Sequence, residues 1–320
     1  MDNVHDRLHV VLGATGGAGG ALVEELARRG HRVRAVSRNP AADLAEGVER
    51  VAADVADPTQ ARRACQGATV VYHCVQPPYE RWAVEFPPLT QSIAQAAASA
   101  GARLVFADNL YAYGPVQGPM TEELPALATT RKGRIRARMA ERLLEAHRAG
   151  TLQVAIGRSS DYYGPGGANS VVGEVLFGAA VQGRRARWLG RLDVPHTLNY
   201  LSDVARALAT LGERPQALGG VWHLPAAEPL TGRGFVELIA AALGRPVRVT
   251  ATSRLALRVA GVVDARARES AEMLYQWERP FVVDAAKFQG AFGPFEPTPH
   301  QRAVAATVAW FQQRADRTPR

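Results

Sequence analysis

Four polar side chains follow two apolar segments of the chain, and their types are suited to proton transfer. Asn109, Tyr111 and Tyr113 follow the first segment, and Asp161 follows the second. If both segments are strands of one parallel sheet, these groups lie at its carboxyl edge, where such sheets bind ligands. A tyrosine hydroxyl or an amide can polarise a carbonyl or an imine, and a carboxylate can accept a proton. We therefore predict Asn109, Tyr111, Tyr113 and Asp161 as catalytic candidates.

Further polar residues lie near these four in the expected topology: Lys132, Arg138, Tyr162, His196 and Asn199. Several have an equally good structural explanation, because the tyrosines also suit core or turn positions and His196 also suits a loop. Arg131, Arg134 and Arg138 are spaced by three and four residues, which is typical of an exposed helix face. If that face turned toward the cleft, it would bind an acidic substrate or the cofactor.

A glycine-rich loop near the amino terminus predicts a dinucleotide site. Gly13, Gly16 and Gly19 stand between an apolar segment and an amphipathic segment over residues 17–29, so a strand, a tight turn and a helix are expected. Glycine allows the backbone to turn sharply and to approach a pyrophosphate closely. The amino terminus of the following helix offers free N–H groups to the phosphates. An ordinary glycine-rich surface loop is the alternative.

The end of the second expected strand discriminates between the two nicotinamide cofactors. An acidic residue there would bind a ribose hydroxyl, but the chain has Ser37 and Arg38. A guanidinium binds a phosphate with two hydrogen bonds, so NADP(H) is predicted; a solvated arginine is the alternative. Asp54, after the third expected strand, either lies beside the adenine or is a turn residue before Pro58.

The cofactor-binding residues that we predict come from the glycine loop, the ends of four strands and one helix. They are Gly13, Thr15, Gly16, Gly17, Ala18, Gly19, Ser37, Arg38, Asp54, Val55, Val75, Gln76 and Arg138.

Strand-like and helix-like segments alternate along the first half of the chain, which predicts an α/β fold with a doubly wound parallel sheet. Helices are expected at 89–100 and 134–149, with turns at Pro77-Pro78 and Pro87-Pro88. Strands are expected at 10–12, 32–38, 70–75, 103–107 and 153–157. We predict a Rossmann domain over 1–165, to which 191–225 return, and a smaller carboxyl-terminal substrate lobe formed by 166–190 and 226–320.

Composition narrows the class of protein. The chain has 320 residues and a net charge of +8, but its arginines are scattered, so we expect no nucleic-acid partner. It has no apolar run of about 18 uncharged residues and no signal-like start, so no membrane partner and a cytoplasmic location are expected. Cys65 and Cys74 have no suitably spaced metal-binding partners, so reduced thiols and no metal site are expected. A small organic molecule is the expected substrate.

The order of motifs resembles the extended short-chain dehydrogenase/reductase family, which includes sugar-nucleotide epimerases and dehydratases. The resemblance covers nearly the whole chain: the glycine loop, the segment 70–75, Tyr113-Gly114-Pro115, Met139 to Leu143, Tyr163-Gly164-Pro165, Asp203 to Ala205 and Val308 to Trp310. It implies a Rossmann fold, a nicotinamide cofactor and often a homodimer. Arg38 stands where NADP-dependent members similar to the flavonol reductases carry their phosphate-binding arginine.

The chain departs from this family at the catalytic positions. Family members use a Tyr-x-x-x-Lys pair, in which the lysine lowers the tyrosine pKa, and a Ser or Thr on the preceding strand. Those three positions hold Gly133, Ala137 and Asn109 here, and no tyrosine lies between Tyr113 and Tyr162. Since Gly133 and Ala137 share a helix face, we expect extra volume beside the nicotinamide.

Three hypotheses follow from these observations. The first is an NADP(H)-dependent oxidoreductase that reduces a carbonyl or imine with Tyr111, Tyr113 or Asn109 in place of the family tyrosine. The second is a non-redox epimerase, dehydratase or cyclase-like enzyme in which Asp161, Tyr113 or His196 transfers protons. The third is a cofactor-sensing protein without catalysis, because a fold does not by itself specify a function.

Overall fold

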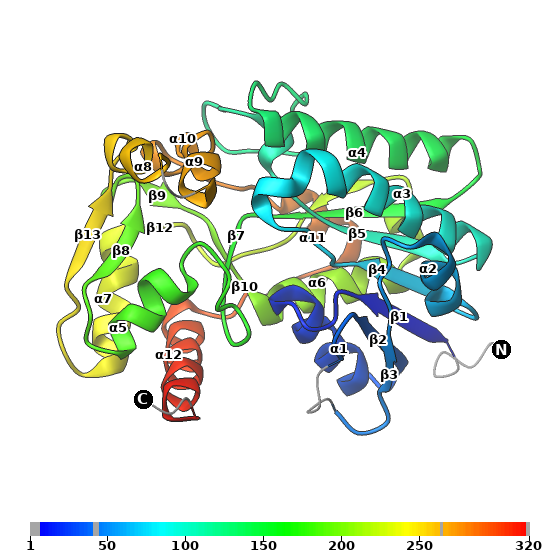
Figure 1. The fold of residues 1–320 in the computed structure, drawn as a ribbon, viewed down its shortest axis with the longest axis horizontal. Helices are drawn as coiled ribbons and strands as arrows, with labels where there is room; N and C mark the ends of the chain where they lie inside the picture. The colour runs from blue at the N-terminus through cyan, green and yellow to red at the C-terminus, as the bar shows by residue number, and fades with distance from the viewer. Residues whose placement is uncertain (1–6, 41–44, 263–264, 318–320) are drawn as a thin grey trace.

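A parallel sheet of seven strands forms the centre of the larger lobe in the computed structural model, which describes residues 7–40, 45–262 and 265–317 (Figure 1). The strand order is β11-β6-β5-β4-β1-β2-β3, and every neighbouring pair is parallel. The strands are β1 (Leu8–Leu12), β2 (Arg32–Ser37), β3 (Glu49–Ala52), β4 (Val70–His73), β5 (Arg103–Asn109), β6 (Gln153–Ser159) and β11 (Val221–His223). The predicted doubly wound α/β fold is confirmed.

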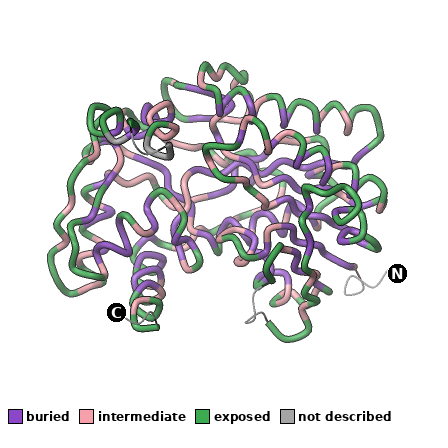
Figure 2. Tube along the Cα trace, viewed as in Figure 1, coloured by how far each residue is buried: buried purple, intermediate pink, exposed green. Residues whose placement is uncertain are grey.

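Helices cover both faces of this sheet, as the continuous apolar character of its strands requires. Side chains of three helices pack on one face: α2 (Pro58–Cys65), α3 (Trp82–Ser99) and α4 (Arg131–Arg148). Three others pack on the opposite face: α1 (Gly17–Arg28), α6 (Leu201–Glu213) and α11 (Ala286–Phe292). Figure 2 shows the strands and the inner helix faces as buried segments.

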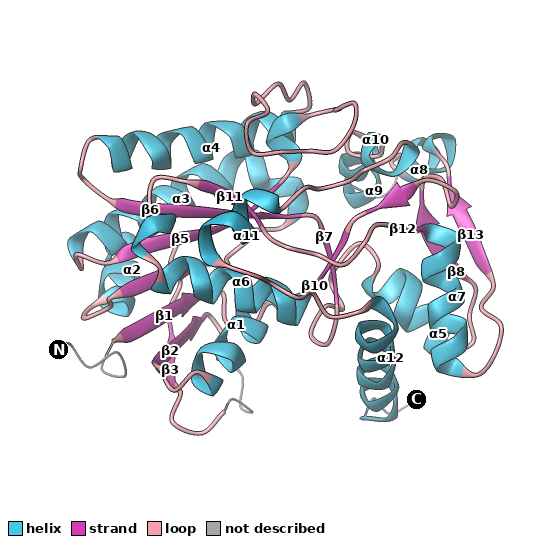
Figure 3. Ribbon diagram, turned by 180° about the vertical axis from the view of Figure 1, so that it is seen from behind, coloured by secondary structure: helices cyan, strands magenta, loops and turns pink. Residues whose placement is uncertain are grey.

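The smaller lobe is built on a separate core. Its strands form three short pairs, β7 (Asp161–Tyr163) with β10 (Leu198–Tyr200), β9 (Pro195–His196) with β12 (Leu230–Thr231), and β8 (Ala186–Leu189) with β13 (Val249–Thr252). A π-helical segment, Gly173–Gly178, continues into α5 (Ala179–Val181). The other helices are α7 (Gly232–Leu243), α8 (Arg254–Ala260), α9 (Ala265–Ala271), α10 (Tyr275–Glu278) and α12 (His300–Arg317). Figure 3 shows this lobe beside the carboxyl ends of β5 and β6.

The domain boundaries stay a prediction, and the structure adds one detail to them. Residues 191–225 contribute α6 and β11 to the larger lobe, while α11, which we expected in the smaller lobe, packs against the main sheet through Phe288.

The expected turn at Pro87-Pro88 is wrong, because both prolines lie inside α3, which begins at Trp82 rather than near Leu89. A proline inside a helix costs about 3 kcal/mol. Trp82 and Phe86 are fully buried in the first turns of α3, and the Trp82 indole donates to the Pro77 carbonyl at 3.1 Å. Tertiary packing of two large aromatic side chains therefore outweighs the local preference.

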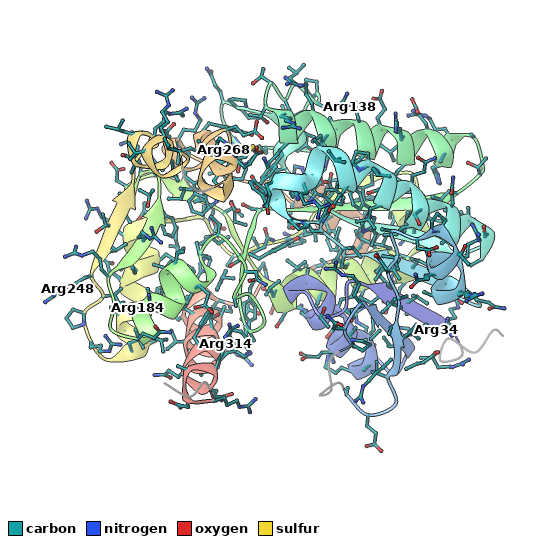
Figure 4. All side chains as sticks on the ribbon, viewed as in Figure 1. Arg34, Arg138, Arg184, Arg248, Arg268 and Arg314 are labelled. Atoms are coloured by element: carbon teal, nitrogen blue, oxygen red, sulfur yellow. The ribbon has the colours of Figure 1, made fainter. Side chains whose placement is uncertain are left out.

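Within the ranges that the structure describes, no helix is both long and apolar enough to cross a lipid bilayer. The arginines labelled in Figure 4 come from both lobes, in line with the scattered positive charge of the sequence.

Candidate active site

The glycine loop joins β1 to α1 and is packed so tightly that side chains are excluded. A Cβ at Gly13, whose φ is +86°, would lie 2.8 Å from the Cys74 carbonyl oxygen, and a Cβ at Gly19 would collide with the Gly13 carbonyl. The amino terminus of α1 has neither a capping side chain nor an acidic residue in its first turn. Its free N–H groups and helix dipole therefore form an open site for an anion.

The residues predicted to select the cofactor lie at the carboxyl end of β2. Arg38 is exposed, and the buried Ser37 Oγ has no hydrogen-bond partner among the described residues. Asp54 is exposed and accepts from the Ala56 N–H at 3.1 Å, so its carboxylate stabilises a turn. An exposed guanidinium beside an unpaired hydroxyl suits a phosphate group.

A pair of tyrosines lies near the carboxyl edge of the sheet, with Tyr111 after β5 and Tyr79 after β4. Both are partly exposed, and their rings lie 6.1 Å and 5.0 Å from the Trp82 ring between centroids. Burial raises the pKa of Tyr111 well above its usual value, and the charge of Asp161 raises it further. Tyr79 is affected in the same way, first by burial. Both hydroxyls therefore stay protonated at neutral pH and act as donors rather than bases.

Asp161, at the start of β7, is hydrogen-bonded to His196 of β9. The His196 Nε2 lies 2.9 Å from Asp161 Oδ2, and its Nδ1 lies 3.2 Å from the Gln276 carbonyl oxygen. The imidazole stacks on Trp277 with ring centroids 3.9 Å apart. Asp161 keeps 15% of its side chain exposed, while His196 is fully enclosed. Of this pair, the Asp161 carboxylate is therefore the group that a ligand can contact.

Tyr275 of α10 adds a third hydroxyl from the smaller lobe. Burial raises its pKa, and the charges of Glu272 and Asp161 act in the same direction. The residue is 8% exposed, and its hydroxyl has no hydrogen-bond partner among the described residues. A buried hydroxyl without a partner is costly, so a ligand that bonds to it would remove this cost.

Four of the predicted polar residues form hydrogen bonds that hold the local structure. The Tyr113 hydroxyl lies 2.8 Å from His223 Nε2, and the Tyr162 hydroxyl accepts from Ser159 Oγ at 2.8 Å. Asn199 ties the end of β6 to residues 224–225 through its amide. Asn109 Oδ1 accepts from the Tyr111 N–H at 3.1 Å and so orients the start of that turn. Of the four catalytic candidates, the structure brings together Tyr111, Asp161 and Asn109. The fourth, Tyr113, is hydrogen-bonded to His223 of β11 instead.

The first turn of α4 is joined to the smaller lobe. Glu272 accepts from the N–H groups of Arg131 and Lys132 at 2.9 and 3.2 Å, which satisfies the helix amino terminus. The buried Lys132 ammonium also donates to Glu272 and to Glu269, and lies over the Tyr79 ring. This cluster connects the two lobes beside the tyrosine pair.

The arginine that faces the core from α4 is Arg136 rather than the predicted Arg138. Arg131, Arg134 and Arg138 are exposed, which agrees with the prediction that they form an exposed helix face. Arg136 is buried, donates to Asp108 Oδ1 at 3.2 Å and lies over the rings of Trp82 and Phe86. The same Asp108 accepts from Arg158 at 3.0 Å.

The expectation of extra volume beside Gly133 is wrong. A Cβ at Gly133 would lie 2.5 Å from the Tyr111 carbonyl oxygen and 2.8 Å from Thr130 Oγ1, and would also collide with the Ala128 side chain. Ala128 and Thr130, in the segment before α4, and the Tyr111 backbone occupy the space that a tyrosine would need. Glycine is required here by the close approach of the Tyr111 backbone.

Gly133→Ala should lower the free energy of unfolding by about 1–3 kcal/mol, because the added methyl group has no space and neighbouring backbone must shift. In an ordinary helix interior the same change stabilises by about 0.5–1 kcal/mol, so the sign is reversed here. Gly290→Ala in α11 is the matched control, since nothing lies within 4 Å of its added Cβ. Urea denaturation of both variants measures the difference. Equal stabilisation by the two changes would contradict the packing argument.

Sequence reasoning missed Tyr79, Glu272 and Arg136. The sequence does contain a signal for Arg136, because Ile135, Met139 and Leu143 define the buried face of α4 and Lys132 and Arg136 fall on it. Tyr79 carries no comparable signal, because it lies in a short 3-10 turn.

Among the described residues, no group of three or more His, Cys, Asp or Glu side chains is arranged to hold a metal ion.

Comparisons with known proteins agree with the fold of the larger lobe. A comparison of the sequence with curated proteins finds no match. MoeE5 with UDP-glucose and NAD is 20% identical, with 97% of this chain and 99% of that chain covered and a TM-score of 0.77. A double mutant of DesIV, a dTDP-glucose 4,6-dehydratase from Streptomyces venezuelae with NAD bound, is 19% identical, with coverage of 97% and 98% and a TM-score of 0.78. UDP-glucuronic acid 4-epimerase from Bacillus cereus with NAD is 14% identical, with coverage of 96% and 99% and a TM-score of 0.78. At these identities the likeness shows a shared fold.

The sequence also matches the model of the NAD dependent epimerase/dehydratase family over residues 9–223. The chain therefore belongs to the NAD dependent epimerase/dehydratase family.

Proposed function

We propose that the protein is an NADP(H)-dependent oxidoreductase that reduces a carbonyl or imine of a small organic substrate, with Tyr111 as the proton donor. The observation that carries the proposal is the placement of Tyr79, Tyr111 and Asp161 after β4, β5 and β6, at the carboxyl edge where open α/β sheets bind ligands. The hydroxyls stand in place of the absent Tyr-Lys pair.

The residues present fit a dinucleotide. The tight glycine loop and the uncapped amino terminus of α1 suit the pyrophosphate, and Ser37 with Arg38 suits a 2′-phosphate. Structural neighbours bind NAD, so NADP is proposed on the basis of Ser37 and Arg38 alone. A bound nicotinamide supplies the hydride for reduction.

Tyr79 and Tyr111 are placed to act together, because both rings pack against the indole of Trp82. In the proposed reaction the Tyr111 hydroxyl donates to a substrate oxygen or nitrogen. As the proton leaves Tyr111, the Tyr79 hydroxyl stabilises the phenolate that forms. Because the pKa of Tyr111 is raised by burial and by Asp161, Tyr111 acts as an acid in reduction.

Wild-type protein should bind NADPH about tenfold or more tightly than NADH, a difference of roughly 1.4 kcal/mol, and Arg38→Ala should abolish that preference. The guanidinium at 38 is exposed and free to contact a 2′-phosphate. Titration followed by nicotinamide fluorescence measures both affinities. Arg148→Ala removes one exposed charge at the far end of α4 and should leave the preference unchanged. If neither nucleotide binds, the proposed function fails.

A second function is favoured by the Asp161–His196 pair. A carboxylate linked to an imidazole can move a proton to and from carbon or oxygen, as an epimerase or dehydratase requires, and the family includes both activities. Such an enzyme would form product without a net change in NADPH absorbance, which distinguishes it from the reductase.

We also propose a cytoplasmic homodimer, as expected from the sequence. Cys65 and Cys74 are free thiols, which is consistent with a reducing compartment.

A further inference from the structure

His196 is surrounded by acceptors on both ring nitrogens. Its Nδ1 lies 3.2 Å from the carbonyl oxygen of Gln276, and its Nε2 lies 2.9 Å from Asp161 Oδ2. The residue is 1% exposed, so water does not provide an alternative partner. A backbone carbonyl only accepts, and an ionised carboxylate only accepts. A neutral imidazole has one N–H and can satisfy one of these two oxygens.

We infer that the Asp161–His196 pair holds one proton more than a separate carboxylate and neutral imidazole, and that this pair restores the proton that Tyr111 gives up. Two forms satisfy both hydrogen bonds: an imidazolium beside a carboxylate, or a neutral imidazole beside a carboxylic acid. Either form stores a transferable proton beside the tyrosine pair. The catalytic part of this inference rests on the proposed function, whereas the proton count does not.

The surroundings of the ring favour the imidazolium form. His196 stacks on Trp277 at 3.9 Å and on Phe281 at 5.0 Å between ring centroids, and aromatic faces stabilise a cation. Charged groups that act on the tyrosines of the site include Asp161 itself, Glu272, which is bonded to Lys132 and caps α4, and the cations of Arg136 and Arg279. Tyr79, Tyr111 and Tyr275 add no charge, because burial raises the pKa of each.

The proton balance of a reduction can be followed through these atoms. The Tyr111 O–H bond breaks and an O–H or N–H bond forms on the substrate, while the hydride comes from NADPH as the proposed function states. The resulting Tyr111 phenolate then takes the stored proton from the pair. The Asp161 side chain is 15% exposed, so the pair takes up a replacement proton from water at the Asp161 carboxylate. His196 is a positioning residue in this scheme, and Asp161 is the member of the pair whose charge acts on the tyrosines.

The proton count is measured by NMR on protein labelled with ¹⁵N histidine and ¹³C aspartate, without cofactor or substrate. At a pH of about 8, well above the reference histidine pKa of about 6.5, an ordinary ring carries one proton. We expect wild-type His196 to show two protonated ring nitrogens, or Asp161 to show a protonated carboxyl. His196→Asn assigns the ring signals by removing them.

His223 provides a control within the same spectrum. Its Nδ1 lies 2.9 Å from the Asp284 carbonyl and its Nε2 lies 2.8 Å from the Tyr113 hydroxyl, which can donate. A neutral ring satisfies both bonds, so His223 should show one N–H at the same pH. In Asp161→Asn the amide can donate to Nε2, and His196 should then also fall to one N–H.

One N–H on His196 together with an ionised Asp161 in the wild-type protein would overturn the inference. That result would leave the proposed function standing, because NADPH binding and the effect of Tyr111→Phe are measured separately. Conversely, an inactive or non-binding protein with the extra proton present would count against the proposed function alone.

Discussion

Tyr111→Phe should reduce kcat/KM for a substrate that oxidises NADPH by about a hundredfold to ten-thousandfold, the range associated with loss of a general acid. Phenylalanine keeps the ring and its contact with Trp82, at 6.1 Å between centroids, but removes the transferable proton. NADPH affinity should stay unchanged, because the glycine loop and Arg38 are untouched. Steady-state assays with a substrate from a carbonyl and imine screen, together with fluorescence titration, test both statements.

Tyr113→Phe is the matched control for that experiment. The Tyr113 hydroxyl is bonded to His223, so its loss leaves a buried acceptor without a partner and should cost about 1–3 kcal/mol of stability. Turnover per folded molecule should be close to that of the wild type. If Tyr113→Phe abolished turnover and Tyr111→Phe did not, Tyr111 would not be the donor.

Asp108→Ala should lower the free energy of unfolding by about 3–5 kcal/mol, the largest stability effect that we expect in this chain. The Asp108 carboxylate is fully buried and accepts from Arg136 at 3.2 Å and from Arg158 at 3.0 Å. Burial lowers the pKa of Arg136, and Asp108 opposes that effect. Removing the carboxylate leaves two buried guanidinium groups without their counter-charge.

Asp193→Ala is the control for that change, because Asp193 also pairs with an arginine but both side chains are more than half exposed. An exposed pair of this kind contributes about 0–1 kcal/mol. Urea denaturation of both variants compares them directly. A loss of the same size in the two variants would show that burial of the Asp108 cluster is not what makes it important.

The larger lobe was predictable from sequence because its signals are local. Five apolar segments and a glycine loop determine strands and a turn wherever they occur, and the structure has them within a few residues of the predicted positions. The lobe that contributes Tyr275 and Glu272 was less predictable, because its strands have two to four residues and pair across long sequence separations. Which side chains it brings to the site depends on tertiary packing.

The α4 helix shows where reasoning from the sequence succeeded and where it failed. Its range and its exposed arginine stripe were predicted, but the cations on its buried face were not selected as functional. Charged residues are rarely buried unless they are paired, and the partners of Lys132 and Arg136 come from α9, the following turn and β5. Those partners become visible only when the elements are placed together in space.

The close packing at Gly133 also has an evolutionary consequence. Replacing Gly133 with tyrosine and Ala137 with lysine would not restore the family's catalytic pair, because the Tyr111 carbonyl, Thr130 and Ala128 already occupy the first position. The step at Gly133 would pass through a destabilised protein, and the segment before α4 would have to move first. Packing therefore blocks the family's pair on α4, whereas the proposed donor, Tyr111, stands in the turn after β5.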